Sequence, residues 1–224
     1  MNISELNDWL LSEHQQPLII GILNVTPDSF TDGGKFLDHN TAVNHAMDMI
    51  DNGADIIDIG GESTRPFSDP VSEEEELSRV ISVIQKIREK TDIVISIDTT
   101  KSVVAEKACD AGANIINDIS ALSFDHHMID TVNKYDCPII LMHMVGNPKT
   151  MQKSPSYSNI IPQITDHLLS RANFALSSGV KKHNIILDPG IGFGKTVDDN
   201  FTIINNMDKF TKLGYPVLIG ASRK

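Results

Sequence analysis

The chain has 224 residues, 40% of them hydrophobic and 22% charged, which is typical of one globular domain with a sizeable core. A formal net charge of −11 argues against non-specific nucleic-acid binding, although a local basic cluster can still receive an anionic substrate. No stretch approaches the roughly 20 apolar residues of a membrane span, and the first residues lack the pattern of a signal peptide. Cys109 and Cys137 lack metal or redox-motif spacing and are expected to be reduced thiols of a cytoplasmic protein.

Short apolar stretches and amphipathic stretches alternate along the whole chain. The first predicted strand, residues 18–23, is an isoleucine-rich run too short for a helix, and it ends at Asn24, where a long polar loop begins. The clearest predicted helix spans residues 72–90. Ser72 and Glu75 have the capping-box pattern at its start, acids fill its first turn, and apolar residues recur at helical spacing.

The other elements are predicted in the same way, from periodicity and from glycine stops. Strands are expected at residues 18–23, 54–59, 93–97, 114–116, 138–142, 185–187 and 216–219, and helices at residues 3–14, 40–52, 72–90, 101–111, 125–134, 160–177 and 199–212. No linker, fixed-period repeat or low-complexity segment interrupts the alternation. The pattern predicts one α/β domain, either a (β/α) barrel or a doubly wound sheet.

Polar residues follow the predicted strands at the points where the strands end. They are Asn24, residues 62–65, Asp98, Asn117, His143, Asp188 and residues 222–224. Because the strand ends of a barrel converge on one mouth, these residues are expected to form a shared site. Capping of the next helix explains any one of them, but seven polar exits in a row favour the shared site.

The stretch 188–196 is glycine-rich but fits neither of two common phosphate-binding loops. A P-loop would need a glycine where Pro189 stands, and the glycines of the stretch are not spaced as in the dinucleotide fingerprint. They instead predict a close approach of the backbone to a flat ligand. The segment 142–144, Met-His-Met, fits either core packing or a wall of such a ligand.

Seven stretches carry a further signal when they are taken together: GILNVTPDSFTDGG (21–34), DIIDIGGESTRP (55–66), ISIDTTK (95–101), IINDIS (115–120), LMHM (141–144), ILDPGIGFGK (186–195) and LIGASRK (218–224). In this order they closely resemble the dihydropteroate synthase family of folate biosynthesis. The resemblance implies an α/β fold of the TIM (β/α)8-barrel type. It also implies that residues 1–224 form a single pterin-binding domain, with the eighth strand and last helices absent from the given chain.

The resemblance further implies a reaction. Members of the family condense 6-hydroxymethyl-7,8-dihydropterin pyrophosphate with p-aminobenzoate, giving 7,8-dihydropteroate and pyrophosphate with the help of Mg²⁺. Pyrophosphate leaves first, so that a delocalised pterin cation forms, and sulfonamides mimic p-aminobenzoate. Members of the family are commonly cytoplasmic homodimers. The resemblance therefore also implies a cytoplasmic homodimer with small-molecule partners and with no nucleic-acid or membrane partner.

Residue roles are implied at the positions that match the family's motifs. The expected pterin-binding residues are Asp98, Asn117, Met142, Asp188, Phe193, Gly220 and Lys224. The expected catalytic residues are Asp98, Lys224 and Asp32, and Asn24 is the expected ligand of Mg²⁺. The p-aminobenzoate region is expected to include Phe30, Thr64, Arg65 and Pro66.

Two other functions stay open on the residues alone. The methyltetrahydrofolate-binding domain of corrinoid methyltransferases would share the Asp and Asn contacts to a pterin, but it is not expected to carry the loop sequences 24–34 and 63–66 or the terminal Ser-Arg-Lys of residues 222–224. A non-catalytic pterin-binding fragment would bind the ligand without turnover. In the synthase interpretation, the loops 26–36 and 62–72 are expected to close when pyrophosphate and p-aminobenzoate are present.

Overall fold

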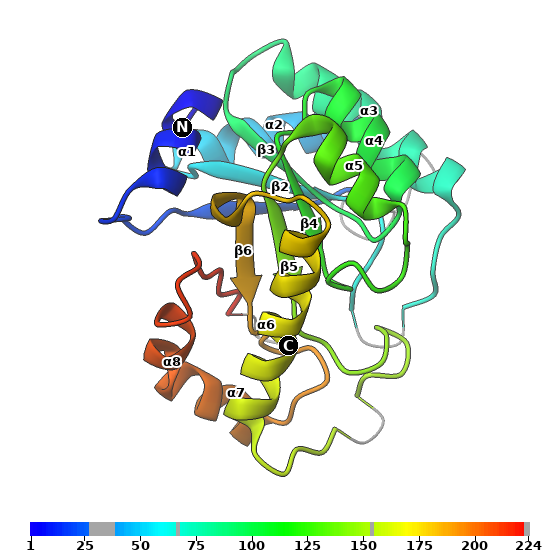
Figure 1. Ribbon diagram of the computed structural model, residues 1–224. Coiled ribbons are helices and arrows are strands. Elements are labelled where there is room, and N and C mark those ends of the chain that lie inside the picture. The colour runs from blue at the N-terminus through cyan, green and yellow to red at the C-terminus, as the bar shows by residue number, and fades with distance from the viewer. Residues whose placement is uncertain (27–38, 66–67, 153–154, 222–224) are drawn as a thin grey trace. The chain divides into compact units, whose positions relative to one another are not determined.

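A computed structural model of the protein describes residues 1–26, 39–65, 68–152 and 155–221 (Figure 1). The chain divides into two compact units. The first consists of Met1–Ser63 and Pro70–Asn117, and the second consists of Thr64–Asp69 and Asp118–Lys224. The chain therefore leaves the first unit after Ser63 and returns to it at Pro70.

Helices and strands alternate in the first unit as predicted. Its elements are α1 (Ile3–Leu11), β1 (Ile20–Asn24), α2 (His39–Asp51), β2 (Ile56–Gly60), α3 (Glu73–Arg88), β3 (Val94–Asp98), α4 (Ser102–Ala111) and β4 (Ile115–Asp118), the last residue of which belongs to the second unit. Each lies close to its predicted range, so the sequence prediction of these elements is confirmed.

The strands of the first unit pair in parallel, each with the next one along the chain. In this register Asn24 pairs with Gly60 at the ends of β1 and β2. Asp98 of β3 pairs with Gly60 on one side and with Asn117 of β4 on the other. Parallel strands end at a common edge, so the register brings three polar residues predicted from the sequence into one row.

The helices of the first unit cover its strands. Helix α2 packs against β1 and β2, and α3 packs against α2, β2 and α4 (Figure 1). The apolar residues of α3, including Val80 and Ile84, are fully buried. At its start the Ser72 hydroxyl accepts the Glu75 N–H at 3.2 Å, but the Glu75 carboxylate pairs with Arg79. Only the serine half of the predicted capping box is therefore present.

The second unit contains the elements that follow β4. They are α5 (Met128–Tyr135), β5 (Ile139–Met142), α6 (Ile160–Ser177), the 3-10 helix η2 (Lys182–Asn184), β6 (Ile185–Asp188), α7 (Val197–Asn205) and α8 (Met207–Thr211). Strands β5 and β6 pair in parallel, with Met142 opposite Asp188, and α6 packs against both strands. Among the described residues of either unit, no helix has the length and apolar character needed to cross a membrane.

The strand predicted at residues 216–219 is wrong. The segment makes only an isolated bridge between Val217 and Leu187. Two backbone hydrogen bonds accompany the bridge, from Leu187 N to the Pro216 carbonyl and from Leu218 N to the Leu187 carbonyl, each of 2.9 Å. Proline has no N–H to extend such a ladder, and the segment is at most half-buried, so little holds it in a longer strand.

The helix predicted at residues 199–212 is observed as two shorter helices. Helix α7 starts two residues earlier because Thr196 and Asp199 form a complete capping box. Asn206 then interrupts the helix with φ −121° and ψ 24°, and its side chain donates to the Thr202 carbonyl. This local side-chain bond competes with helical continuation, which accounts for the break between α7 and α8.

Candidate functional site

Two predicted site residues of the first unit meet above the end of β2. A Cβ atom placed on Gly60 would lie 3.4 Å from Oδ2 of Asp98 and 3.7 Å from Oδ1 of Asn24. The two oxygens therefore approach the same point from β1 and β3, the two strands that flank β2, and Gly60 leaves that point open because it has no side chain. Asn24 is exposed and Asp98 is half-buried, so a ligand can reach both side chains.

The third strand-end residue, Asn117, is hydrogen-bonded to an acid that the sequence analysis did not single out. Nδ2 of Asn117 donates to Oδ2 of Asp58 at 3.1 Å, and Asp58 lies two residues before Gly60 on β2. Asp58 is only 8% exposed. Burial raises the pKa of its carboxyl, while hydrogen bonding opposes that shift. Asn117 is half-buried and keeps part of its amide accessible.

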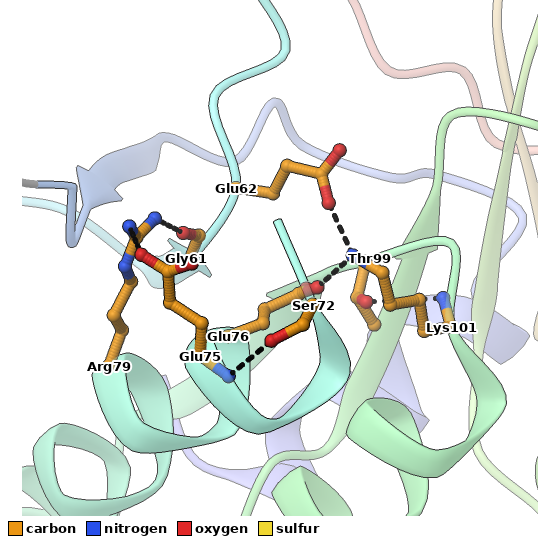
Figure 2. A network of polar contacts seen from close by, with 8 residues as sticks. All are labelled: Gly61, Glu62, Ser72, Glu75, Glu76, Arg79, Thr99 and Lys101. Atoms are coloured by element: carbon orange, nitrogen blue, oxygen red, sulfur yellow. Dashed lines mark hydrogen bonds and ion pairs between the residues drawn. The ribbon is translucent and has the colours of Figure 1, made fainter. Parts of the chain in front are cut away.

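A charged network anchors the chain where it leaves β2. Nζ of Lys101 contacts Oε2 of Glu62 and lies 2.5 Å from Oε2 of Glu76 (Figure 2). The side chain of Glu76 is 1% exposed and that of Lys101 is 21% exposed. Burial lowers the pKa of Lys101, but the hydrogen bonds that it donates to Glu62 and Glu76, together with the negative charges of these two residues, raise it more, so the net shift is upward.

Arg79 of α3 binds the chain at Gly61, the residue that follows β2. Its Nη1 donates to the Gly61 carbonyl at 2.6 Å, and its Nη2 pairs with Oε1 of Glu75 (Figure 2). A Cβ atom on Gly61 would lie 2.8 Å from Cγ1 of Val80 and 2.9 Å from Cγ of Glu76. Only glycine fits where β2 meets α3, so the start of the predicted loop 62–72 is held tightly against the helix.

In the second unit, the predicted pterin residues Met142 and Asp188 end neighbouring strands. The N–H of His143 donates to the Asp188 carbonyl at 2.9 Å, and Oδ1 of Asp188 accepts the Gly190 N–H at 2.7 Å. Gly190 has φ +70°, and a Cβ atom there would lie 2.1 Å from the His143 carbonyl oxygen. Gly190 is therefore a steric requirement of this strand end, and Asp188 is both buried and oriented by the turn.

A buried lysine closes the glycine-rich stretch 188–196. Nζ of Lys195 lies 3.0 Å from Nδ1 of His143, 3.1 Å from the His143 carbonyl and 2.9 Å from the Phe193 carbonyl. Burial lowers the pKa of Lys195 to about 7, although Asp188 and another nearby carboxylate oppose the shift. Burial also lowers the pKa of His143 to about 3, so that the imidazole is neutral at pH 7. Lys195 thus holds the turn together through neutral acceptors.

The other predicted residues fall into two groups. Phe193, Thr64 and Gly220 are half-buried in the second unit and Arg65 is exposed there, with its carbonyl accepting the Ser68 N–H and hydroxyl. The predictions for Phe30, Asp32, Pro66 and Lys224, and for most of the loop 26–36, lie outside the described residues.

The convergence of all strand ends on one mouth stays a prediction. Within the described parts of the chain, no three His, Cys, Asp or Glu side chains are grouped to hold a metal ion.

Five charged residues of these clusters were missed from the sequence: Asp58, Glu76, Arg79, Lys101 and Lys195. Two of them left a detectable signal. Asp58 interrupts an apolar strand shortly before its end, and Glu76 lies on the apolar face of α3 although its place in the acidic first turn suggested only helix initiation. Because charged residues are rarely fully buried without a partner, each position predicts a partner on another element.

Comparison with known proteins gives consistent relatives. A family model described as "Pterin binding enzyme" matches residues 20–224. The dihydropteroate synthase of Clostridium beijerinckii is 52% identical, over 94% of this chain and 76% of the relative, and that of Bacillus subtilis is 48% identical, over 96% and 73%. A solved dihydropteroate synthase of Yersinia pestis, in complex with a sulfonamide drug, has a TM-score of 0.87 at 41% identity and covers 93% of this chain and 75% of that one. These matches confirm the predicted fold class.

Proposed function

The chain belongs to the family of pterin-binding enzymes, and we propose that it is a dihydropteroate synthase. It joins 6-hydroxymethyl-7,8-dihydropterin pyrophosphate to p-aminobenzoate and releases pyrophosphate, which makes it a transferase. The observation that carries the proposal is the row of Asn24, Asp98 and Asn117 at the ends of parallel strands in a chain of this family. The relatives reported above are synthases, which favours this function over the corrinoid methyltransferase alternative.

Pterin recognition is assigned to the amide and carboxylate groups at the strand ends. The pyrimidine edge of a pterin offers adjacent N–H donors and a ring-nitrogen acceptor. A buried carboxylate such as Asp188 suits two such donors, and the Asn117 amide suits a donor beside an acceptor. Met142, Phe193 and Gly220 are proposed as further contacts to the ring, and Lys224 is proposed to donate to its carbonyl side.

Asp98 is proposed to stabilise the pterin cation that forms when pyrophosphate departs. A fixed carboxylate beside a developing positive charge lowers the energy of the transition state more than that of the neutral substrate. The half-buried position of Asp98, held by strand pairing to both neighbours, supports this role because little reorganisation is needed. The aromatic amine is already a nucleophile, so the mechanism needs no activating base, and Asp32 is proposed to help close the site.

Mg²⁺ is proposed as the cofactor, with Asn24 as its protein ligand. The fit is chemical: Asn24 is exposed at the strand end, and an amide oxygen suits a hard cation that keeps most of its waters. Bound Mg²⁺ would neutralise charge on the pyrophosphate leaving group. Asn24 would orient that group beside Asp98, whose oxygen approaches the same point above Gly60.

The second substrate, p-aminobenzoate, is proposed to bind at Phe30, Thr64, Arg65 and Pro66. The Yersinia pestis relative is described in complex with a sulfonamide, and a synthase of Xanthomonas albilineans in complex with 4-aminobenzoic acid. The Arg65 guanidinium is exposed and suits the carboxylate of p-aminobenzoate. A sulfonamide is expected to compete with this substrate in the present protein.

We also propose a cytoplasmic homodimer. Helix α7 exposes an apolar stripe made of Val197, Phe201 and Ile204, which are 70%, 61% and 42% exposed. Apolar side chains grouped at helical spacing are typical of a protein–protein contact. Sedimentation of the parent and of Phe201→Glu tests the dimer. Cys109 and Cys137 are not joined in a disulfide, which suits a reducing compartment.

The decisive experiment is product formation from the two purified substrates. Release of 7,8-dihydropteroate is expected, and Asp98→Asn should lower kcat about 100-fold or more while changing pterin affinity far less. Asp110→Asn on the exposed side of α4 is the matched control. Pterin binding without any product in the parent protein would contradict the proposal and favour a non-catalytic binding module.

A further inference from the structure

Asp58 is a buried acid that the proposed mechanism does not use. It lies inside β2 between apolar residues, paired in register with Ile22 and Ser96 of the neighbouring strands. Placing a carboxylate in such an environment costs stability unless it makes a specific contact. Its described contact to the strand-end row is the hydrogen bond from Asn117, a residue 59 positions away in the chain.

The contact restricts how the Asn117 amide can be turned. An amide has a carbonyl oxygen on one side and an NH2 group on the other, and rotation by half a turn exchanges them. An ionised carboxylate only accepts hydrogen bonds, so the NH2 group must face Asp58. The 3.1 Å distance joins Nδ2 of Asn117 to Oδ2 of Asp58. The amide oxygen and the second N–H of Asn117 are then left in one defined arrangement.

We propose that Asp58 is a positioning residue that fixes the orientation of the Asn117 amide for recognition of the pterin edge. The inference rests on the proposed pterin-binding function. It assigns to Asp58 a role in specificity, since an amide held this way matches a ligand edge with an acceptor beside a donor and rejects the reversed order. Without Asp58, both amide orientations become accessible, and ligand binding has to select one of them.

A double-mutant cycle on Asp58 and Asn117 tests the inference. Binding of 6-hydroxymethylpterin is measured by calorimetry for the parent, Asp58→Leu, Asn117→Ala and the double variant. Asp58→Leu should weaken binding about twofold or more in the parent, because only the molecules whose Asn117 amide is correctly turned are then ready to bind. In the Asn117→Ala background the same change should have no effect, because Asp58 acts only through Asn117.

Asp58→Asn is the conservative variant. Its amide keeps the size of the aspartate but can donate to Asn117 as well as accept from it, so it no longer enforces one orientation of the Asn117 amide, and we expect affinity to fall about as far as in Asp58→Leu. A purely structural role of Asp58 would instead leave the affinity of this near-isosteric variant close to that of the parent. Melting temperatures of all variants exclude loss of fold as the cause of weaker binding, and Asp58→Ala replaces Asp58→Leu in the cycle if leucine prevents cooperative unfolding.

Equal losses from Asp58→Leu in both backgrounds would overturn the inference, since Asp58 would then act on the ligand or on another group. Parent-like affinity in Asp58→Asn would also overturn it, since the orientation of Asn117 would then not depend on a partner that only accepts hydrogen bonds. In either case the parent still forms 7,8-dihydropteroate, and the proposed function stands. If the parent neither binds 6-hydroxymethylpterin nor forms product, both the function and the positioning role are wrong.

Discussion

Two lysines that lie largely out of solvent, one in each unit, are held in opposite ways. Lys101 meets the carboxylates of Glu62 and Glu76, and its pKa is shifted upward. Lys195 meets an imidazole nitrogen and two carbonyl oxygens, and its pKa falls to about 7. Hydrogen bonds alone therefore satisfy a buried ammonium group geometrically, whereas only negative partners compensate for the loss of water around its charge.

The largest expected effect is that of removing Lys101. Lys101→Met leaves the carboxylate of Glu76 buried without its positive partner, which is expected to lower the free energy of unfolding by about 3 kcal/mol. Urea unfolding measures the change. Lys107→Met is the matched control in α4, the helix that follows Lys101, because Lys107 and Asp110 form an exposed pair at 3.5 Å, and the expected change is below about 0.5 kcal/mol. Similar changes in both variants would mean that burial of Glu76 is unimportant.

The pH dependence of stability should distinguish the two lysines. The pKa of Lys195 is about 7 in the folded protein and ordinarily 10.5, so above pH 7 the unfolded chain binds more protons. The free energy of unfolding then rises with pH, by up to about 1.4 kcal/mol per unit, or about 1.6 kcal/mol between pH 7 and 8.5, because Lys195 is still half protonated at pH 7.

Subtracting the same curve for Lys195→Met isolates this contribution from other titrating groups. The parent-minus-variant difference should rise between pH 7 and 8.5 for Lys195→Met. It should stay flat for Lys101→Met, because a raised pKa keeps Lys101 charged in both states over that range. A flat difference for Lys195 as well would mean that its three neutral acceptors are enough to keep it charged.

The smallest expected effect comes from Glu62. Its side chain is 26% exposed, so Glu62→Gln leaves the amide oxygen and nearby water to contact Lys101, which keeps Glu76. We expect a loss of at most about 1 kcal/mol in the free energy of unfolding. The KM for p-aminobenzoate is expected to rise while stability changes little, because Glu62 begins the loop proposed to bind that substrate. If the free energy of unfolding falls as far as in Lys101→Met, Glu62 would contribute as much as Glu76 to offsetting the burial of the Lys101 charge.

Much of the fold was predictable because its signals are local. Apolar runs ending at Asn24, Asp98, Asn117 and Asp188 marked strand ends, and caps and glycines marked most helix limits. The errors were local too: Pro216 weakened the last predicted strand, and Asn206 divided the last helix. Both residues were visible in the sequence. Whether they would interrupt the strand or the helix depended on how much apolar surface the surrounding segment buries, because burial can offset the loss of regular hydrogen bonds.

The sequence by itself determined which residues stand at strand ends, because side chains alternate along a strand and polar residues interrupt apolar runs at fixed positions. It did not determine their neighbours across the sheet. The contact of Asp58 with Asn117, and those of Lys101 with Glu62 and Glu76, join residues 59, 39 and 25 positions apart. Only the tertiary structure decided these partners, because the register between strands and the packing of α3 beside α4 set which buried charges meet.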